Sequence, residues 1–332
     1  MTSISDVDTV ADVNFASLDL NLLVSLDALL QQRSVTKAAA QMGLSQPALS
    51  ASLARLRRHF GDELLTRVGN EYRLTPLAVQ LRDLARLALT GVERVFTAQT
   101  EFDPASSTRE FSLLISDYGV AVLGDTIAAL LAEEAPGARL RLAANTPASV
   151  DRAEQILLST DLLILPHGFV DDLSHQDLYR DDWVCVVASG NEAVGEQLTV
   201  DNLENLPWVV TFHGPTAATP AARQMRMRGI EPNVQVITEN FLTVPALVAG
   251  SNRIALMQRR LVDLLPLNLG LRALAPPVEV GQLVEAMWWH PAFDDDPEHA
   301  YLRDLVVRAS HLAVGTGEAD SIDSVDAVAQ PS

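Results

Sequence analysis

Residues 35–67, VTKAAAQMGLSQPALSASLARLRRHFGDELLTR, contain two helical patterns separated by a tight turn. Apolar side chains recur on one face of the first helix, at Val35, Ala38, Ala39 and Met42, before Gly43 ends the pattern. In the second helix Ser45 is a natural N-cap, and Pro47 falls in the first turn, where its missing N–H costs no hydrogen bond. The stretch therefore predicts a helix-turn-helix.

The second of these helices has two different faces. Its buried stripe repeats at the helical period, through Leu49, Leu53, Leu56 and Phe60. The opposite face is small and hydrogen-bonding and ends in arginines, with Gln46, Pro47, Ser50, Ala51, Ala54, Arg55 and Arg58. Such a face suits a helix that enters the major groove of DNA. An ordinary amphipathic surface helix has the same spacing, so spacing alone leaves both interpretations open.

The distribution of charge favours DNA binding. Residues 18–75 carry seven basic and five acidic side chains, a net charge of +2. The whole chain carries −19, which leaves −21 for the remainder. A positive segment that coincides with a helix-turn-helix is the electrostatic footprint that phosphate contacts require. The acidic remainder argues against a nonspecific nucleic-acid coat protein.

Residues 18–76 resemble the N-terminal winged helix-turn-helix of LysR-type transcriptional regulators. The resemblance rests on four motifs, LDLNLL at 18–23, AA at 38–39, LSQPALS at 44–50 and LxRLRxxFxDEL at 53–64. It is closest to the branch of the nodulation and aromatic-catabolism regulators, and it extends more weakly to about residue 312. Many family members have glutamate where Arg57 stands, and the nodulation branch shares this departure.

On this interpretation the helix-turn-helix and its hairpin supply the contacts to promoter DNA. Base edges would be read by Gln46, Pro47, Ser50 and Ala51, with Gln46 a candidate for adenine. Phosphates would be contacted by Thr36, Ser52, Arg55, Arg58 and Arg67, and Ser45 and Arg73 complete the predicted set. Asp62–Leu74 predicts a hairpin wing turning at Gly69-Asn70. Arg67 or Arg73 alone could equally be a plain surface charge.

A long helix is predicted from Pro76 to about residue 99. Its apolar residues follow a spacing of three and four, at Leu74, Leu77, Leu81, Leu84, Ala88 and Val95. So long a helix beside a small winged domain has little to pack on, so we expect it to mediate dimerisation. The resemblance implies the same dimer-forming helix and favours a tetramer. Two-fold symmetry predicts a roughly palindromic DNA site.

Length and composition limit the number of domains and the class of protein. Its 332 residues predict two or three domains. No apolar run reaches the ~18 residues of a membrane span, and no Lys or Arg precedes Arg33, so we expect neither a membrane segment nor a secretory signal. The single cysteine, Cys185, reads as a small buried strand residue. These features fit a reducing cytoplasm.

From Phe111 apolar strands alternate with helices. Strands are predicted at 111–117, 138–144, 161–166, 182–189, 207–212, 233–239, 253–258 and 283–290. This alternation predicts parallel, doubly wound sheets, and about 200 residues of it predict two α/β lobes. The resemblance implies an effector domain of the type 2 periplasmic-binding-protein kind, in which the chain crosses between lobes near 182–190 and 268–280.

These patterns divide the chain into six parts. We expect a disordered lead at 1–17, the winged helix-turn-helix at 18–75 with its motif at 35–54, the linker helix at 76–99 and a hinge at 100–109. The effector-binding domain follows at 110–314, with lobe I at about 110–182 and 275–314 and lobe II at about 183–274. A disordered tail is expected at 315–332.

Ligands of open α/β sheets lie at the carboxyl ends of strands, where polar residues follow several strands here. The predicted effector-binding set is Ser116, Asp117, Tyr118, Thr211, His213, Asn240, Phe241 and His290. Each could instead be a helix cap or a loop residue. We expect no cofactor and no metal site, and we interpret His213 and His290 as structural. The branch resemblance implies an aromatic acid or flavonoid-like effector.

Two function classes remain in competition. The leading one is a DNA-binding regulator whose effector changes the angle between lobes, with RNA polymerase as a further partner if it activates. The alternative is an α/β small-molecule-binding protein or enzyme with an incidental helix pair. Against an enzyme, the chain lacks the nucleotide-binding, P-loop, nucleophile-elbow and zinc-protease motifs, and we predict no catalytic residue. An architectural DNA protein fits poorly with the acidic body.

Overall fold

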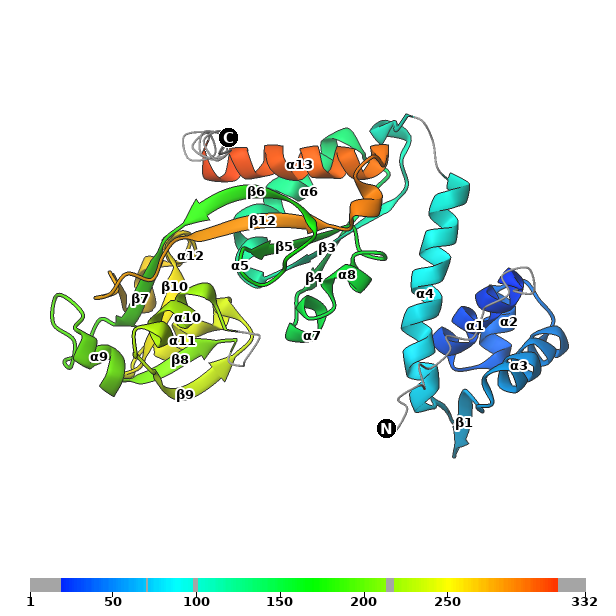
Figure 1. The fold of residues 1–332 in the computed structure, drawn as a ribbon, viewed down its shortest axis with the longest axis horizontal. Coiled ribbons are helices and arrows are strands. Elements are labelled where there is room, and N and C mark those ends of the chain that lie inside the picture. Colours follow the sequence, from blue (N-terminus) through cyan, green and yellow to red (C-terminus); the bar gives the residue numbers. More distant parts are fainter. Residues whose placement is uncertain (1–18, 70, 98–100, 213–217, 316–332) are drawn as a thin grey trace, which may run out of the picture. The chain divides into compact units, whose positions relative to one another are not determined.

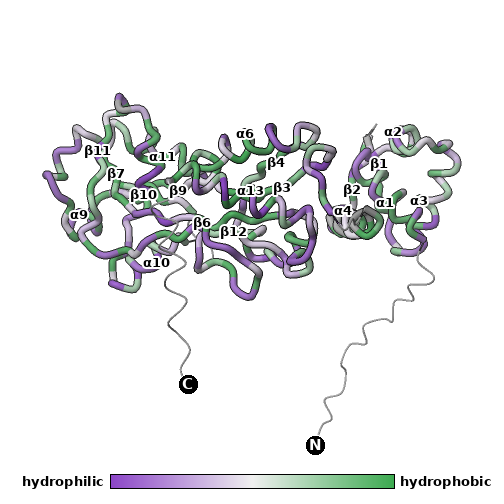
Figure 2. The backbone as a smooth tube through the Cα atoms, turned by 90° about the horizontal axis from the view of Figure 1, so that it is seen from above, coloured by the Kyte–Doolittle hydropathy of each residue, from purple (hydrophilic) through white to green (hydrophobic). Residues whose placement is uncertain are grey.

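The computed structural model describes residues 19–69, 71–97, 101–212 and 218–315 (Figure 1). The predicted disordered lead and nearly all of the predicted tail lie outside the described residues. The contacts between Cα atoms divide the chain into two units, residues 1–98 and 99–332, which are described separately below. Within both units the hydrophobic segments gather in the strands and the inner helices (Figure 2). Among the described residues no helix is both long enough and apolar enough to cross a membrane.

The first unit is a three-helix domain with a hairpin and a long helix. Its elements are α1 (Leu20–Gln32), α2 (Val35–Gln41), α3 (Gln46–Phe60), β1 (Leu65–Val68), β2 (Glu71–Leu74) and α4 (Pro76–Thr97). Leu26, Leu29 and Leu30 of α1 form the centre of the core, against Ala38 and Ala39 of α2. The predicted stripe of α3 is buried there at Leu49, Leu53 and Leu56, which fixes the rotation of α3 about its axis.

Local hydrogen bonds set the ends of the helices, as the capping residues predict. The Ser34 hydroxyl accepts from the Lys37 N–H at 3.3 Å, and the Ser45 hydroxyl accepts from the Ala48 N–H at 3.3 Å. Gly61 ends α3 in the left-handed region, at φ 63°. Arg57 donates from Nε to the Glu63 carbonyl at 2.8 Å and from Nη2 to the Leu65 carbonyl at 3.0 Å. It therefore ties α3 to the base of the hairpin.

The long helix α4 uses only part of its apolar seam on its own domain. Ala78 and Ala85 are buried and Leu81 is partly buried against the core. Leu84 is 59% exposed although it is next to the buried Ala85, and further along Val95 is 73% exposed and Phe96 is 81% exposed. The first unit thus leaves apolar side chains of this helix uncovered at Leu84, Val95 and Phe96.

Lobe I of the second unit is a five-stranded sheet in the order β4-β3-β5-β12-β6. Its strands are β3 (Glu110–Ile115), β4 (Arg139–Ala144), β5 (Leu162–Pro166), β6 (Ser174–Asp181) and β12 (Leu283–Trp289). The helices α6 (Asp125–Glu134) and α13 (Pro297–Val314) lie on one side of it in Figure 1, and α7 (Pro147–Val150) and α8 (Ala153–Ile156) on the other. Burial from both sides explains why β5 is an unbroken apolar run.

Lobe II is a second five-stranded sheet, in the order β11-β7-β10-β8-β9. Its strands are β7 (Trp183–Ala188), β8 (Pro207–Thr211), β9 (Asn233–Thr238), β10 (Ile254–Gln258) and β11 (Leu271–Leu274). Its helices are α9 (Val200–Asn205), α10 (Pro220–Met227), α11 (Val244–Val248) and α12 (Arg259–Asp263). Cys185 is buried in β7, and burial raises the pKa of its thiol to about 12, which keeps it protonated and unreactive.

The sheets are mixed, so the prediction of wholly parallel sheets was wrong. β12 is antiparallel to β5 and β6, and β7 is antiparallel to β10 and β11. In each lobe the reversed strand is the one by which the chain arrives from the other lobe. It starts at the end where the parallel strands finish, and it therefore runs the opposite way. Only Asp182 separates β6 from β7, whereas residues 275–282 make the second crossing.

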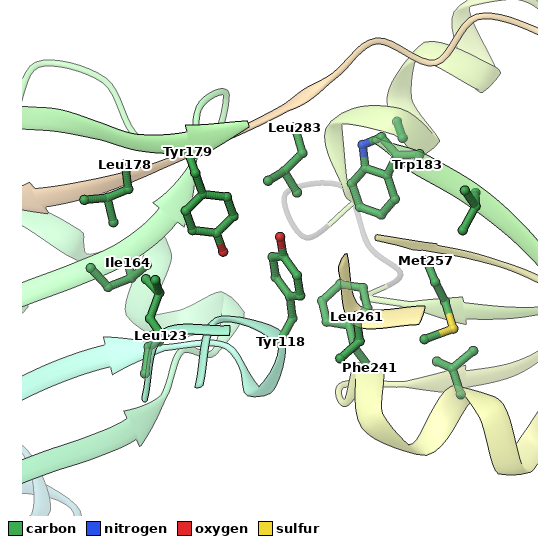
Figure 3. Packing of buried hydrophobic residues seen from close by; sticks show 14 of the residues in the cluster. Tyr118, Leu123, Ile164, Leu178, Tyr179, Trp183, Phe241, Met257, Leu261 and Leu283 are labelled. Carbon is green, nitrogen blue, oxygen red and sulfur yellow. The ribbon is translucent and has the colours of Figure 1, made fainter. Parts of the chain in front are cut away.

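One hydrophobic cluster continues through both lobes. Figure 3 shows Tyr118 and Tyr179 of lobe I facing Phe241, Leu261 and Trp183 of lobe II. The Tyr118 hydroxyl donates to Asp181 Oδ2 at 2.7 Å, and the backbone N–H of Arg260 donates to the same carboxylate at 3.3 Å. The lobes are thus joined by apolar packing as well as by the chain.

Candidate DNA-binding surface and interlobe cavity

The N-terminal half of α3 presents a polar, small-residue face to solvent. Gln46, Pro47, Ser50 and Ala51 are all exposed, while the leucines on the other side of the helix are buried. Because the core fixes the helix rotation, this face is held outward as a rigid surface. Its side chains are short enough for close approach to base edges.

The residues predicted to contact phosphate lie on α2, on α3 and its N-cap, and on the hairpin. Thr36, Ser45, Arg58, Arg67 and Arg73 are exposed, and Ser52 is half-buried. Arg55 is exposed but forms an ion pair with Asp19 at 3.1 Å, which a phosphate would have to replace. Ser45 also has the structural role of capping α3.

The hairpin register separates the two wing arginines. Arg67 pairs with Tyr72, and Arg73 pairs with Thr66. Neighbouring cross-strand pairs point to opposite faces of a hairpin, so the two guanidinium groups lie on different faces. They would therefore contact different phosphates. Asn70, at the predicted turn, lies outside the described residues.

A cavity lies between the two lobes of the second unit. The cavity volume is about 60 Å³, within about 600 Å³ of empty space that includes open solvent. Lobe I contributes the carboxyl ends of β3 and β5, and lobe II contributes the end of β10 and the loop after β8. The lining is Ser116, Tyr118, Asn145, Thr146, Pro147, Val150, Leu165, Pro166, Phe169, Trp183, Phe212, Thr219, Pro220, Phe241, Gln258, Leu283 and Glu285.

Three of the predicted effector-binding residues, Ser116, Tyr118 and Phe241, line this cavity. The Ser116 hydroxyl also accepts from the Gly119 N–H at 3.1 Å and so caps α5 (Asp117–Gly119). The rings of Tyr118 and Phe241 meet edge to face across the lobes, with centroids 6.4 Å apart. These two rings form an aromatic wall of the cavity.

Four predicted residues lie elsewhere. Asp117 accepts from the Phe241 N–H at 3.1 Å and the Leu242 N–H at 2.7 Å, so it joins the lobes. Asn240 accepts from the Thr243 N–H, and His290 Nδ1 accepts from the Ala292 N–H, each as a helix cap. Thr211 faces a separate hollow in lobe II, and His213 lies outside the described residues.

The cavity also contains polar residues that the sequence did not identify, above all Trp183, Gln258 and Glu285. Trp183 and Gln258 are opposite each other in the pairing of β7 with β10. Trp183 is 5% exposed and Gln258 is 1% exposed. Trp183 Nε1 and Gln258 Oε1 have no hydrogen-bond partner in the part of the chain that the structure describes. Buried polar atoms without partners are rare and indicate a place for a ligand or water.

Glu285 changes the electrostatics of the cavity. Burial, together with the nearby charge of Asp181, raises the pKa of Glu285 to about 8. At neutral pH this side chain is therefore mostly uncharged. Burial also raises the pKa of Asp181, although Tyr118 donates a hydrogen bond to it. Among the described lining residues there is no arginine or lysine to attract an anion. A buried acid within the apolar run LVEAMWW was the sequence signal for this site.

Two family models match the chain over most of its length. Residues 20–79 match the bacterial regulatory helix-turn-helix protein model of the lysR family, and residues 104–310 match the LysR substrate binding domain. Nodulation protein D 2 of Rhizobium tropici is 33% identical over 91% of this chain and 96% of its own length. Nodulation protein D 3 of Rhizobium leguminosarum bv. phaseoli is 35% identical over 89% and 98%.

Solved structures share the fold. A Pseudomonas aeruginosa protein described as a probable transcriptional regulator has a TM-score of 0.65 at 24% identity, covering 87% of this chain and 96% of its own. The regulator CbnR in complex with its target DNA has a TM-score of 0.62 at 15% identity, covering 88% and 100%. The predicted winged helix-turn-helix and two-lobed α/β architecture are confirmed. The chain therefore belongs to the LysR family of bacterial transcriptional regulators, with a DNA-binding helix-turn-helix and an effector-binding domain.

Proposed function

We propose that this regulator reads a palindromic promoter site with α3 and responds to an uncharged, hydroxyl-bearing aromatic effector held between its lobes. DNA reading by α3 is supported by its exposed polar face, because buried leucines fix the rotation of the helix. Gln46, Ser50 and Ala51 would then meet base edges, and Arg58 would contact phosphate.

The cavity lining supports the uncharged effector. An aromatic acid would bring a carboxylate into a space where no arginine or lysine lines the described wall and where Glu285 and Asp181 can only add negative charge. A phenolic ligand of the flavonoid kind needs no cation. Its hydroxyl oxygen could accept from Trp183 Nε1, and its hydroxyl proton could be donated to Gln258 Oε1. The rings of Tyr118 and Phe241 would cover its aromatic face.

The size of the cavity connects binding to movement. A cavity of about 60 Å³ is much smaller than ordinary ligand sites of about 300–1,000 Å³, so we expect an aromatic effector to bind with the lobes further apart. Separation would strain the contacts that Asp117 makes with Phe241 and Leu242, and that Asp181 makes with Arg260. A ligand that favours the open arrangement would shift the population toward it. This is the proposed allosteric step.

The uncovered apolar surface of α4 supports a dimer. Leu84 and Val95 are eleven residues apart, about three helical turns, and therefore share one face. Both are largely exposed in the isolated first unit. A second copy of this helix would bury them and would place two α3 helices about a two-fold axis, as a palindromic site requires.

Replacing Leu84 and Val95 together with Glu should convert the dimer to a monomer, because burying two carboxylates in the seam costs more than the apolar contact provides. Light scattering coupled to size-exclusion chromatography measures the mass. Met227→Glu alters another exposed apolar residue, in the second unit, and should leave the mass unchanged. A wild-type chain that is monomeric at micromolar concentration contradicts the proposed dimer.

DNA binding is tested by fluorescence anisotropy on promoter fragments. Arg58→Ala should weaken binding to all sequences alike and reduce the salt slope by about 1. Gln46→Ala should cost about 1–3 kcal/mol at the preferred site only. Arg139→Ala removes an exposed charge from the second unit and serves as the control. If Arg58→Ala lowers the affinity for some DNA sequences only, the proposed role of Arg58 as a phosphate contact is wrong.

The effector class is tested by calorimetric titration of the full chain with flavonoid-like phenols and with aromatic carboxylates of similar size. We expect binding of the phenols only. Trp183→Phe should weaken it by about 1 kcal/mol, because the N–H donor is lost while the ring remains. Trp208→Phe is the matched control, since its N–H donates to the Leu203 carbonyl, away from the cavity. Tighter binding of the carboxylates would overturn the proposed effector class.

Glu285 should make stability depend on pH. Its pKa is 4.5 in the reference state and about 8 when folded, so the folded chain keeps a proton that the unfolded chain loses. The stabilisation is fully present below pH 4.5 and is lost as the pH rises through about 8. Between pH 6 and 8 the free energy of unfolding should fall by roughly 2 kcal/mol from this group. Urea denaturation should show a flatter profile for Glu285→Gln and an unchanged one for the exposed Glu279→Gln. Identical profiles for Glu285→Gln and wild type would contradict the raised pKa.

A further inference from the structure

The fold brings together three potential metal ligands that are spread along the sequence. His167 follows β5, while His175 and Asp177 lie on β6. Each offers a ligand atom, and the three atoms all lie within 4.8 Å of one another. His175 and Asp177 are two residues apart on a strand and share a face. Sequence spacing predicted no metal site, because it did not show that the loop after β5 returns beside β6.

The donor set is chemically selective. Two imidazoles and one carboxylate suit Zn²⁺ and similar divalent ions, whereas Mg²⁺ prefers oxygen ligands alone. Metal–ligand distances of about 2.0–2.2 Å place neighbouring donor atoms roughly 3.5 Å apart, so small side-chain rotations are needed. His175 is exposed, and solvent could supply a fourth ligand.

The surroundings hold the imidazole rings in place. Trp288 lies beneath them, with ring centroids 4.6 Å from His175 and 5.1 Å from His167. Its own N–H donates to the Leu165 carbonyl at 2.7 Å, which fixes the indole. His175 Nδ1 lies 3.3 Å from the Leu173 carbonyl, an arrangement that leaves Nε2 for a metal. This outer support is typical of metal-binding histidines.

A simpler account is an ion pair. His167 Nε2 lies 2.5 Å from Asp177 Oδ1, and a protonated His167 would be satisfied by that contact alone. The ion pair makes no use of His175, however, although its ring lies on the same tryptophan. We propose that His167, His175 and Asp177 form a binding site for a divalent metal ion of the zinc type.

The site is adjacent to a contact between the lobes. The carbonyl of Gly168, the residue after His167, accepts from Arg223 Nη2 at 2.6 Å. The Arg223 guanidinium also lies 4.8 Å from the centre of the Phe169 ring, and Phe169 lines the cavity. Arg223 is on α10 of lobe II, so a metal that fixes His167 would hold this loop against the opposite lobe. This consequence rests on the proposed function, whereas metal binding itself does not.

The test is calorimetric titration of the full, tag-free chain with ZnCl₂ alone, at pH 7.5 and without chelators. We expect one equivalent to bind and MgCl₂ not to compete. Asp177→Asn keeps the side-chain shape, and His175→Ala removes an exposed ring, so both should remain folded. Each should weaken Zn²⁺ binding by at least about tenfold. His311→Gln, which removes a histidine from α13, is the matched control and should bind as wild type does.

A second measurement locates the effect. In wild type, Zn²⁺ should slow hydrogen exchange of the amides at 168–173, and in His175→Ala it should not. Zn²⁺ binding that is unchanged in both variants, or that is equally weakened by His311→Gln, would show an adventitious ion only and would overturn the proposed site. Binding without slowed exchange would keep the site and overturn its link to the lobes. Loss of the effector response with intact Zn²⁺ binding would count against the proposed function alone.

Discussion

The two crossings of the chain between the lobes constrain everything that the effector domain does. Because β7 and β12 begin at the cavity, their first residues, Trp183, Leu283 and Glu285, face the space where the parallel strands end. The same crossings hold Asp181 at the junction, where it accepts hydrogen bonds from Tyr118 and from the backbone of Arg260. Any relative movement of the lobes must therefore change the conformation of the chain at these residues. A ligand in the cavity lies directly beside them.

Three buried or partly buried carboxyl groups near the lobe junction differ in their burial and in the hydrogen-bond donors around them. Asp117 is stabilised as an acceptor by two backbone N–H groups of lobe II. Asp181 accepts from three donors, the Tyr118 hydroxyl and the backbone N–H groups of Asp182 and Arg260, yet its pKa is raised because burial outweighs them. Glu285 is buried most completely and is the one held mainly neutral. One short region thus combines a carboxyl group that joins the lobes by hydrogen bonds with a mostly uncharged acid beside the ligand space.

The helix-turn-helix could be predicted because its signals are local. The stripe at Leu49, Leu53 and Leu56 and the caps at Ser34 and Ser45 act within a few residues of themselves. β6 was missed because SHQDLYRD has no apolar alternation, and its pairing with β12 depends on residues a hundred positions away. The predicted effector residues were sought at strand ends, where Asn240 and His290 serve as caps instead. Gln258 and Trp183 meet only after two distant strands pair, which no local pattern records.

The single residue between β6 and β7 has a further consequence for how this chain can vary over evolution. Strand side chains alternate between faces, so inserting or deleting one residue at Asp182 would turn over every side chain of β7. Trp183 would leave the cavity, and Cys185 would exchange its neighbours. A substitution at this position alters only one side chain, whereas an insertion or deletion moves every side chain of β7 to the opposite face of the sheet. Lineages descended from this protein should therefore conserve the number of residues here more strictly than their identity.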